Sequence, residues 1–204
     1  MGTMGRRSTH TPEELRELVL RATEDLVEQN GLVGLSAREI ARSIGYSAGT
    51  LYNCFEHLDD LILHVEARVL DRLDHVLAAV DQTGTPEEHV RRLALSYLAF
   101  TLKQPKLWNL LFEHHLPPTM AVPSWYQEKL DALLARIEVA LRPLAAKISE
   151  AELQRAARVL WAGVHGITSL ATAEKLANVT HDTAQRLVDD LVTNYLAGMR
   201  ARAK

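Results

Sequence analysis

The sequence predicts an all-α protein of about nine helices, in which a small N-terminal unit precedes a larger helical one. No segment alternates apolar and polar residues between turn signals, as a half-exposed strand would. Apolar residues instead recur every three or four positions along most of the chain. Five segments also carry the capping-box pattern of a helix start. They are Thr11/Glu14, Ser36/Glu39, Thr85/Glu88, Ser124/Gln127 and Ser149/Glu152.

The expected helices follow from these starts. The first runs from about Thr11 to Asn30, where Gly31 ends it. The second and third, over 36–44 and 47–54, are short and joined by a tight turn. The remaining helices are expected over 58–80, 85–103, 105–115, 124–141, 149–173 and 180–199. The expected apolar stripe of the helix over 58–80 is Leu61, Val65, Val69, Leu73, Val76 and Val80.

Composition excludes several classes of protein. Of the 204 residues 47% are hydrophobic and 24% are charged, the balance of a soluble globular protein. No apolar run reaches the length of a membrane span, and the N-terminus does not have the pattern of a signal peptide. The single cysteine, Cys54, excludes an internal disulfide and a cysteine-clustered zinc site. We expect a cytoplasmic protein with no cofactor and no membrane partner.

The segment SAREIARSIGYSAGTLYNCF has the features of a helix-turn-helix. Gly45 follows the first short helix, where a left-handed backbone favours glycine, and Ser47 is placed to cap the second. The apolar residues fall where two crossing helices would bury them: Ile40, Ala41, Ile44, Leu51 and Phe55. In such a motif the second helix enters the major groove of DNA.

The same segment resembles the TetR family of bacterial transcription regulators. The likeness lies in Ile40-Ala41, Gly45-Tyr46-Ser47, Gly49-Thr50-Leu51-Tyr52, Phe55 and Leu61, and the segment 161–166 resembles part of a C-terminal dimer helix. The resemblance implies a TetR-like fold, with a DNA-binding domain over 1–58 and a ligand-binding and dimerisation domain over 59–204. It also implies a ligand-responsive homodimer, most simply a repressor that reads a palindromic operator and is released by a small effector.

The resemblance assigns DNA contacts to residues around the motif. Tyr52 is expected on a phosphate, Asn53 on adenine, and Ser36 with the amides that follow it on phosphate. Arg6 and Arg7 would form an arm along the DNA. The whole expected set is Arg6, Arg7, Ser36, Arg38, Ser47, Ala48, Gly49, Thr50, Tyr52, Asn53 and His57. Two simpler interpretations stay open: Tyr52 as an aromatic packed on the first helix, and the two arginines as a solvated tail.

Two departures from the family pattern reduce the number of expected DNA contacts. The family has a lysine where this chain has Leu58, and a histidine where it has Cys54. Residues 1–58 contain six arginines, no lysine and eight acidic residues, a net charge of −2. His57 is a candidate replacement for the lost contacts. An interaction module with weakened DNA binding is therefore the alternative function, and Cys54 is either a buried hydrophobe or a redox switch.

The histidines raise the question of metal binding and catalysis. His114 and His115 are adjacent, so on a helix they point about 100° apart and do not ligate one metal from one face. His181-Asp182 weakly resembles part of an all-helical metal phosphohydrolase, but the further ligands of that fold are missing. No activated nucleophile and no phosphate-binding glycine loop is present. We expect neither a metal site nor an enzyme.

Six of the eleven aromatic residues fall in the helices expected between 85 and 141. They form either plain core or the lining of a ligand pocket, as the family resemblance implies. Tyrosine, tryptophan and histidine side chains have polar groups that suit a pocket better than a core. The expected lining is Tyr97, Phe100, Trp108, Phe112, Trp125, Tyr126 and His165. No Arg or Lys belongs to this set, so the expected effector is a mostly apolar, uncharged small molecule.

The last two expected helices have the pattern of a dimer interface. Small residues recur along the helix over 149–173, which suits close approach of a second helix, and the helix over 180–199 has a wide apolar stripe. The family uses these helices for a two-fold interface. The expected interface is Ala162, Gly166, Ser169, Ala173, Leu187, Leu191 and Tyr195.

Overall fold

A computed structural model describes residues 10–145 and 147–202 of the chain. These residues form nine α-helices and two 3₁₀-helices and contain no strand, so the predicted fold class is confirmed. The elements are α1 (Pro12–Asn30), α2 (Ala37–Ser43), α3 (Ala48–Leu51), α4 (Leu58–Ala78), α5 (Pro86–Lys103), α6 (Pro105–Glu113), α7 (Ser124–Leu141), η1 (Arg142–Leu144), α8 (Glu150–Thr172), η2 (Leu176–Asn178) and α9 (Ala184–Arg202).

Three of the five predicted capping boxes form completely, at the starts of α1, α5 and α8. A fourth is half formed. The Ser36 hydroxyl accepts from the Glu39 amide, but the Glu39 carboxylate accepts from Arg42 instead of reaching back to the cap. The fifth is wrong. The cap of α7 is Pro123, and its carbonyl already accepts from the amides of Tyr126 and Gln127, so Ser124 becomes the first helical residue.

Two other boundaries and one core position differ from the prediction. α3 ends at Leu51, and α9 begins at Ala184 rather than near Thr180, because a 3₁₀ turn precedes it and the Thr183 hydroxyl accepts from an amide of its first turn. On α4, Val76 is 41% exposed whereas Leu77 is buried. Leu77 lies on the side of α4 that faces a cavity between α5 and α7, and this side completes the apolar stripe.

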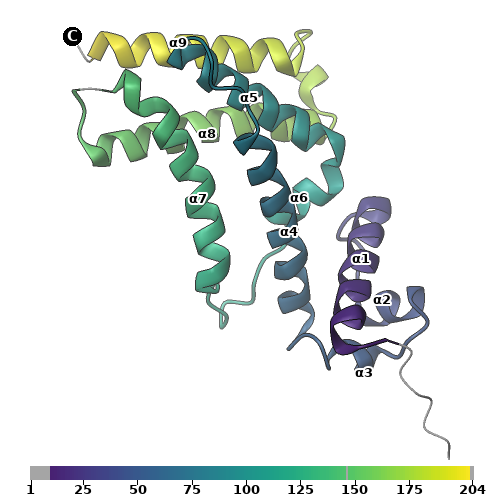
Figure 1. The fold of residues 1–204 in the computed structure, drawn as a ribbon. Coiled ribbons are helices and arrows are strands. Elements are labelled where there is room, and N and C mark those ends of the chain that lie inside the picture. The colour runs from purple at the N-terminus through teal and green to yellow at the C-terminus, as the bar shows by residue number, and fades with distance from the viewer. Residues whose placement is uncertain (1–9, 146, 203–204) are drawn as a thin grey trace, which may run out of the picture.

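The helices are arranged as a small N-terminal unit and a larger bundle joined by α4 (Figure 1). α1, α2 and α3 lie at one end, and α4 runs from them into the bundle, where it packs against α5 and α7. α8 and α9 pack against each other and against α5 at the opposite end of the molecule. No helix in the described part of the chain has both the length and the apolar run that crossing a membrane requires.

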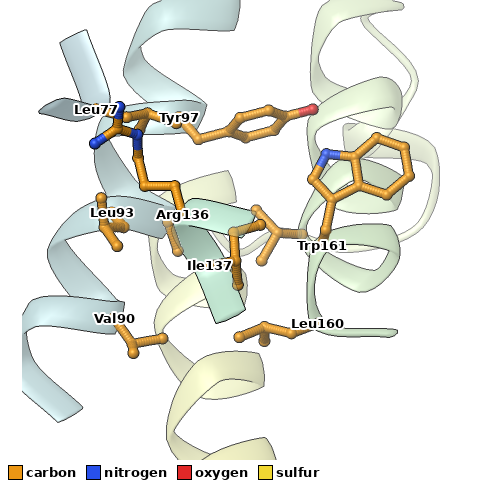
Figure 2. A pocket seen from close by; sticks show the side chains of 10 residues that line it. Leu77, Val90, Leu93, Tyr97, Arg136, Ile137, Leu160 and Trp161 are labelled. Carbon is orange, nitrogen blue, oxygen red and sulfur yellow. The ribbon is translucent and has the colours of Figure 1, made fainter. Parts of the chain in front are cut away.

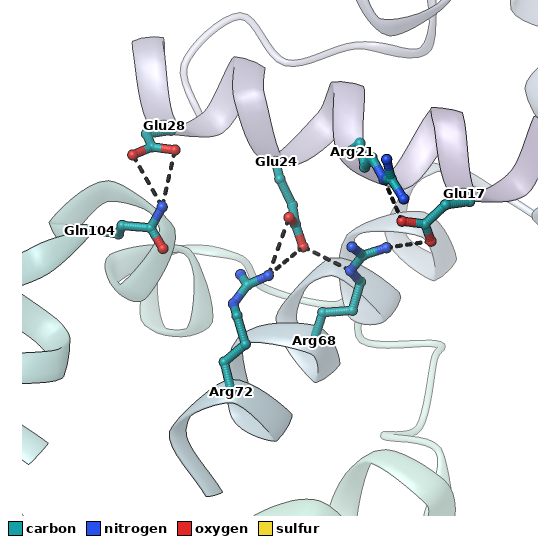
Figure 3. A network of polar contacts seen from close by, with 7 residues as sticks. All are labelled: Glu17, Arg21, Glu24, Glu28, Arg68, Arg72 and Gln104. Carbon is teal, nitrogen blue, oxygen red and sulfur yellow. Dashed lines mark hydrogen bonds and ion pairs between the residues drawn. The ribbon is translucent and has the colours of Figure 1, made fainter. Parts of the chain in front are cut away.

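Ion pairs fasten the N-terminal unit to α4 (Figure 3). Arg68 of α4 lies 2.7 Å from the Glu17 carboxylate and 3.0 Å from that of Glu24, both on α1. One turn further along α4, Arg72 lies 3.1 Å from Glu24. Hydrogen bonds from Arg21 and Arg68 lower the pKa of Glu17, so its carboxylate is charged at neutral pH. α1 and the middle of α4 are therefore connected by ion pairs.

Candidate DNA-reading surface and ligand cavity

The helix-turn-helix forms as the sequence predicts, except that the Ser47 hydroxyl bonds the Thr50 hydroxyl and caps no amide of α3. Gly45 joins α2 to the segment before α3 with a φ of +74°, a left-handed conformation that favours glycine. Ile40, Leu51 and Phe55 are buried between the crossing helices and α1. The Arg16 side chain on α1 donates to the Cys54 carbonyl at 2.7 Å and lies over the Phe55 ring. These contacts fix the orientation of α3 on the unit.

The expected reading residues lie together on and just after α3. Tyr52 is 51% exposed, so the interpretation of it as an aromatic buried against α1 is not favoured. Gly49 and Asn53 are exposed, and Ala48 and Thr50 are half-buried. The hydroxyl groups of Ser47 and Thr50 are 2.9 Å apart and hydrogen-bond to each other. This surface contains no charged side chain.

Most arginines in the described part of this unit already have partners. Arg16 bonds the Cys54 carbonyl, Arg21 pairs with Glu17, and Arg42 pairs with Glu39 at 2.5 Å. Arg38 is exposed on α2 and is available to a phosphate. Arg6 and Arg7, the expected arm, lie outside the described residues. The positive charge that this unit offers to DNA is therefore limited.

The start of α4 shows what replaces the missing lysine. His57 caps the helix, and its Nδ1 accepts from the Asp60 amide at 2.9 Å. A neutral imidazole bonded in this way has its proton on Nε2, which leaves one donor for an outside group. Leu58 begins α4, is half-buried and packs on the core. His57 therefore offers a directional donor where a cation is lost.

Cys54 lies next to this surface and is half-buried. Burial raises the pKa of its thiol, although Arg16 opposes the shift. A thiol with a raised pKa is less often present as the reactive thiolate. The structure favours the interpretation of Cys54 as a small packed hydrophobe over a redox switch.

A cavity of about 310 Å³ lies between α4, α5, α6 and α7. The volume is at the lower end of the range of small-molecule pockets, which is roughly 300–1,000 Å³. Its lining comprises Leu70, Leu73, Leu77, Tyr97, Trp108, Leu111, Phe112, Tyr126, Gln127, Leu130, Leu133, Leu134, Ile137 and Trp161. Phe112 and Gln127 are both in the lining and exposed, and they mark the side on which the cavity reaches the surface.

A smaller cavity of about 50 Å³ continues the first one toward α8. Leu77, Tyr97, Ile137 and Trp161 belong to both linings, and Figure 2 shows these side chains facing the same space. Arg136 is also in this lining, but its guanidinium donates to the Asp74 carboxylate at 2.6 Å. The charge in this wall is neutralised by that ion pair.

The Tyr97 hydroxyl in the cavity wall is hydrogen-bonded to other residues of the protein. The Tyr97 hydroxyl lies 2.9 Å from Nδ1 of His165 and accepts from the Trp161 indole, beside which Figure 2 shows it. His165 stacks on Trp161 with ring centroids 5.2 Å apart. Burial lowers the pKa of His165, so the ring is neutral at pH 7. The wall thus carries no net charge, and within the described residues the buried Trp108 indole N–H in its lining has no hydrogen-bond partner.

Two family models match this chain. The model described as "Bacterial regulatory proteins, tetR family" matches residues 19–65, which include the helix-turn-helix. The model described as "Tetracyclin repressor-like, C-terminal domain" matches residues 90–195, just over half of the chain. The chain belongs to the TetR family. It is a TetR-family transcription regulator with a helix-turn-helix DNA-binding domain.

Solved structures share the fold of this TetR-family chain. A protein of unknown function from Rhodococcus sp. RHA1 is 23% identical, with a TM-score of 0.75, and the match covers 95% of this chain and 98% of that one. A TetR-like transcriptional regulator from the same organism is also 23% identical, with a TM-score of 0.64 and coverage of 93% and 100%. A TetR-family regulator from Streptomyces coelicolor is 18% identical, with a TM-score of 0.69 and coverage of 98% and 85%. No curated protein matches the sequence.

In this TetR-family chain, the cavity lining overlaps with the lining expected from the sequence but does not coincide with it. Tyr97, Trp108, Phe112 and Tyr126 are in the lining. Three expected residues are not. Phe100 is in a separate surface hollow, Trp125 stacks on His64 beside another, and His165 lies behind Tyr97. Sequence reasoning missed Trp161 and the leucines of α4 and α7, whose helical spacing is equally typical of ordinary core.

The expected dimer residues of this TetR-family chain differ in exposure. On α8, Ala162, Gly166, Ser169 and Ala173 are all exposed. On α9, Leu187, Leu191 and Tyr195 are half-buried. Leu191 packs against Gly163, where an added Cβ would lie 2.9 Å from it, and the Tyr195 hydroxyl donates to a carbonyl of α8. The glycines of α8 predicted a close approach of a second helix, and at Gly163 that helix is α9 of the same chain.

The adjacent residues His114 and His115 of this TetR-family chain have different surroundings. His114 turns inward to α4, whereas His115 is exposed and bonds the Glu113 carbonyl. Within the described residues, no group of three His, Cys, Asp or Glu side chains is placed to hold a metal ion.

Proposed function

We propose that the chain acts in the cytoplasm as a homodimeric repressor that reads a palindromic operator and is released by a small apolar effector. The observation that supports the DNA contact most strongly is the exposed, uncharged surface on and after α3. Its side chains are able to contact base edges, but they provide little general attraction to phosphate. TetR-family proteins are generally regulators rather than enzymes, and their binding of DNA and of small molecules is the basis of this proposal.

The cavity defines the class of effector. A cavity of about 150 Å³ lined by apolar side chains binds benzene, so a cavity of about 310 Å³ has room for roughly two such rings. Arg136, in the wall of the adjoining smaller cavity, is paired with Asp74, and the tyrosine hydroxyls have protein partners. A charged effector would lose hydration without gaining a counter-ion. We therefore expect a neutral, mostly apolar molecule of about two rings.

Selection from a random duplex library tests the DNA half of the proposal. The full-length protein is expected to enrich a palindrome whose half-sites lie about one helical turn, 34–36 Å, apart. If no sequence is enriched while the dimer is intact, the alternative of an interaction module with lost DNA binding is correct. Arg42, already paired with Glu39, and the half-buried Leu58 are the features that favour this alternative.

Thermal unfolding with naphthalene, a neutral two-ring probe, tests the cavity. A ligand at 100 times its Kd stabilises the folded state by about 2.7 kcal/mol, which corresponds to a rise in Tm of roughly 5–11 °C for a chain of this size. Leu130→Trp fills the cavity and is expected to abolish the rise. Val139→Trp, on the same helix but 65% exposed, is the matched control and keeps it. Equal shifts in both variants would mean that the probe binds elsewhere.

A further inference from the structure

A buried charged cluster lies where α6 ends against α4, outside both the cavity lining and the DNA-reading surface. His114 directly follows α6, and its side chain is only 6% exposed. Its Nδ1 lies 2.9 Å from the Glu66 carboxylate, and its Nε2 lies 3.1 Å from that of Asp59. The Glu66 side chain is 3% exposed. Both acids belong to α4, so one ring connects two points of that helix to the end of α6.

The hydrogen-bonding geometry determines the charge of this ring. Both nitrogens face carboxylate oxygens, which accept hydrogen bonds when ionised. A neutral imidazole has one N–H and one lone pair, and its lone pair would face a carboxylate. The imidazolium form of His114 donates to both. Burial lowers the pKa of His114, but the hydrogen bonds to Glu66 and Asp59 outweigh this effect, and the net shift is upward.

The surroundings of the ring leave one positive charge between two carboxylates. α4 contributes Glu66 and Asp59, and α7 contributes Tyr126, whose hydroxyl donates to Glu66. On the segment of His114 itself, Glu113 and His115 are exposed, and His115 bonds a backbone carbonyl instead of either acid.

The cluster also lies between the two functional regions. Tyr126 lines the cavity, and Phe112, two residues before His114, lines it as well. Asp59 is in the first turn of α4, four residues after Phe55 in the core of the helix-turn-helix. A displacement of α6 or α7 by a molecule in the cavity would therefore act on the same ring that holds the beginning of α4.

We propose that the His114 imidazolium is a proton-controlled clasp that ties the cavity wall to the first turn of α4 and so regulates the response of the DNA-binding unit. The regulatory part rests on the function proposed above, whereas the clasp itself requires neither DNA nor ligand. Below the ordinary histidine pKa of about 6.5, the contribution to stability is fully present. It is lost as the pH rises through the higher pKa of the folded state, so the clasp opens at alkaline pH.

Nitrogen-15 NMR of the histidine rings in the full chain tests the charge directly. We expect the midpoint at which His114 titrates to lie above the ordinary histidine value of about 6.5, with both ring nitrogens protonated below that midpoint. Glu66→Gln removes one acceptor charge while keeping the shape, and it is expected to lower the midpoint at which His114 titrates. A His114 midpoint at or below about 6.5, or an unchanged midpoint in Glu66→Gln, would overturn the proposal.

Amide hydrogen exchange over residues 58–62 tests the clasp at pH 7 and pH 9. At pH 7, His114→Gln is expected to exchange several times faster than the wild type, because the ring no longer holds Asp59 in the first turn of α4. The matched control His115→Gln should exchange at the wild-type rate. At pH 9 the difference between His114→Gln and the wild type should shrink. If both variants exchange alike at pH 7, His114 holds nothing and the proposal fails.

Naphthalene and the selected duplex separate this proposal from the proposed function. If neither binds, the proposed function fails, while the titration and exchange results still decide the clasp. If both bind, naphthalene should release the duplex from the wild type several times more effectively at pH 7 than from His114→Gln. An equal release from the two proteins would show that the clasp does not transmit the response.

Discussion

The hydroxyl groups of Ser47 and Thr50 hydrogen-bond to each other, whereas Tyr52 and Asn53 are the exposed side chains of the reading surface whose polar ends face solvent. Asparagine pairs with two positions of adenine, whereas a tyrosine hydroxyl suits a phosphate oxygen. The two residues are neighbours in sequence, but they are expected to make contacts of different kinds. Substituting each one separates sequence preference from overall affinity.

Asn53→Ala is expected to change which duplexes are bound. The loss of an adenine contact should reduce discrimination at one base pair by about 1–3 kcal/mol. Tyr52→Phe removes one phosphate hydrogen bond and should weaken binding by about 1 kcal/mol for every sequence. Competition between the selected duplex and single-base variants measures both effects. If Tyr52→Phe altered the base preference, its assignment to phosphate would be wrong.

Tyr97→Phe is expected to destabilise the folded chain although it barely changes the shape of the cavity. The hydroxyl is buried and bonds both His165 and Trp161, so its removal leaves two polar groups without a partner. A loss of about 1–3 kcal/mol in the free energy of unfolding is expected from urea denaturation. Tyr52→Phe, at an exposed position, is the control and should change stability by less than about 0.5 kcal/mol.

At the scale of the helix, the starts could be predicted because their signal is local. A threonine or serine cap with a glutamate three residues later forms the complete boxes of α1, α5 and α8, whereas at Ser36 the glutamate bonds Arg42 instead. Ser124 carried the same signal, but Pro123 took the cap because its carbonyl accepts the first amides of α7. The end of α3 and the start of α9 depend on the hydrogen bonds of the adjoining turns. The spacing of residues in the sequence does not predict these bonds.

Leu58→Lys tests the start of α4 as part of the DNA-binding surface. The wild-type dimer, with few available cations, is expected to lose roughly 10³-fold in affinity between 50 and 200 mM salt. Lysine at position 58 should tighten binding to all sequences and steepen the salt slope by about 1 per added phosphate contact. Leu58→Gln is the uncharged control for the lost packing. A change of sequence preference in Leu58→Lys would place position 58 near the bases instead.

At the scale of the whole molecule, the cavity lining depends on how the helices pack against one another, and this packing could not be predicted from the sequence. The aromatic cluster predicted a cavity in about the right place, and four of its seven residues are in the lining. Trp161 was missed because its helical spacing on α8 is equally typical of ordinary core. Trp125 was misplaced because its ring stacks on His64 at 4.7 Å, on the other side of α7 from the cavity.

Gly166→Leu is expected to weaken the dimer without disturbing the protomer. An added Cβ at Gly166 meets no atom within 4 Å, so the protomer has room for a side chain there. In a helix interface the extra volume would cost about 1–3 kcal/mol, or roughly 5- to 150-fold in the dimer dissociation constant. Sedimentation velocity measures this shift. Gln154→Leu, exposed on the same helix about 120° away, is the control. Identical sedimentation of the two variants would move the interface elsewhere.

The ion pairs from α1 to Arg68 and Arg72 make α4 a lever arm. Because α1 is fixed to the middle of α4, a change in tilt of this 21-residue helix carries the reading surface with it. The helix is about 30 Å long, so a tilt of about 6° moves its far end by about 3 Å. The rise between neighbouring base pairs is about 3.4 Å. Two such arms in a dimer would go out of register with their half-sites after a rotation too small to disrupt the packing of any core residue.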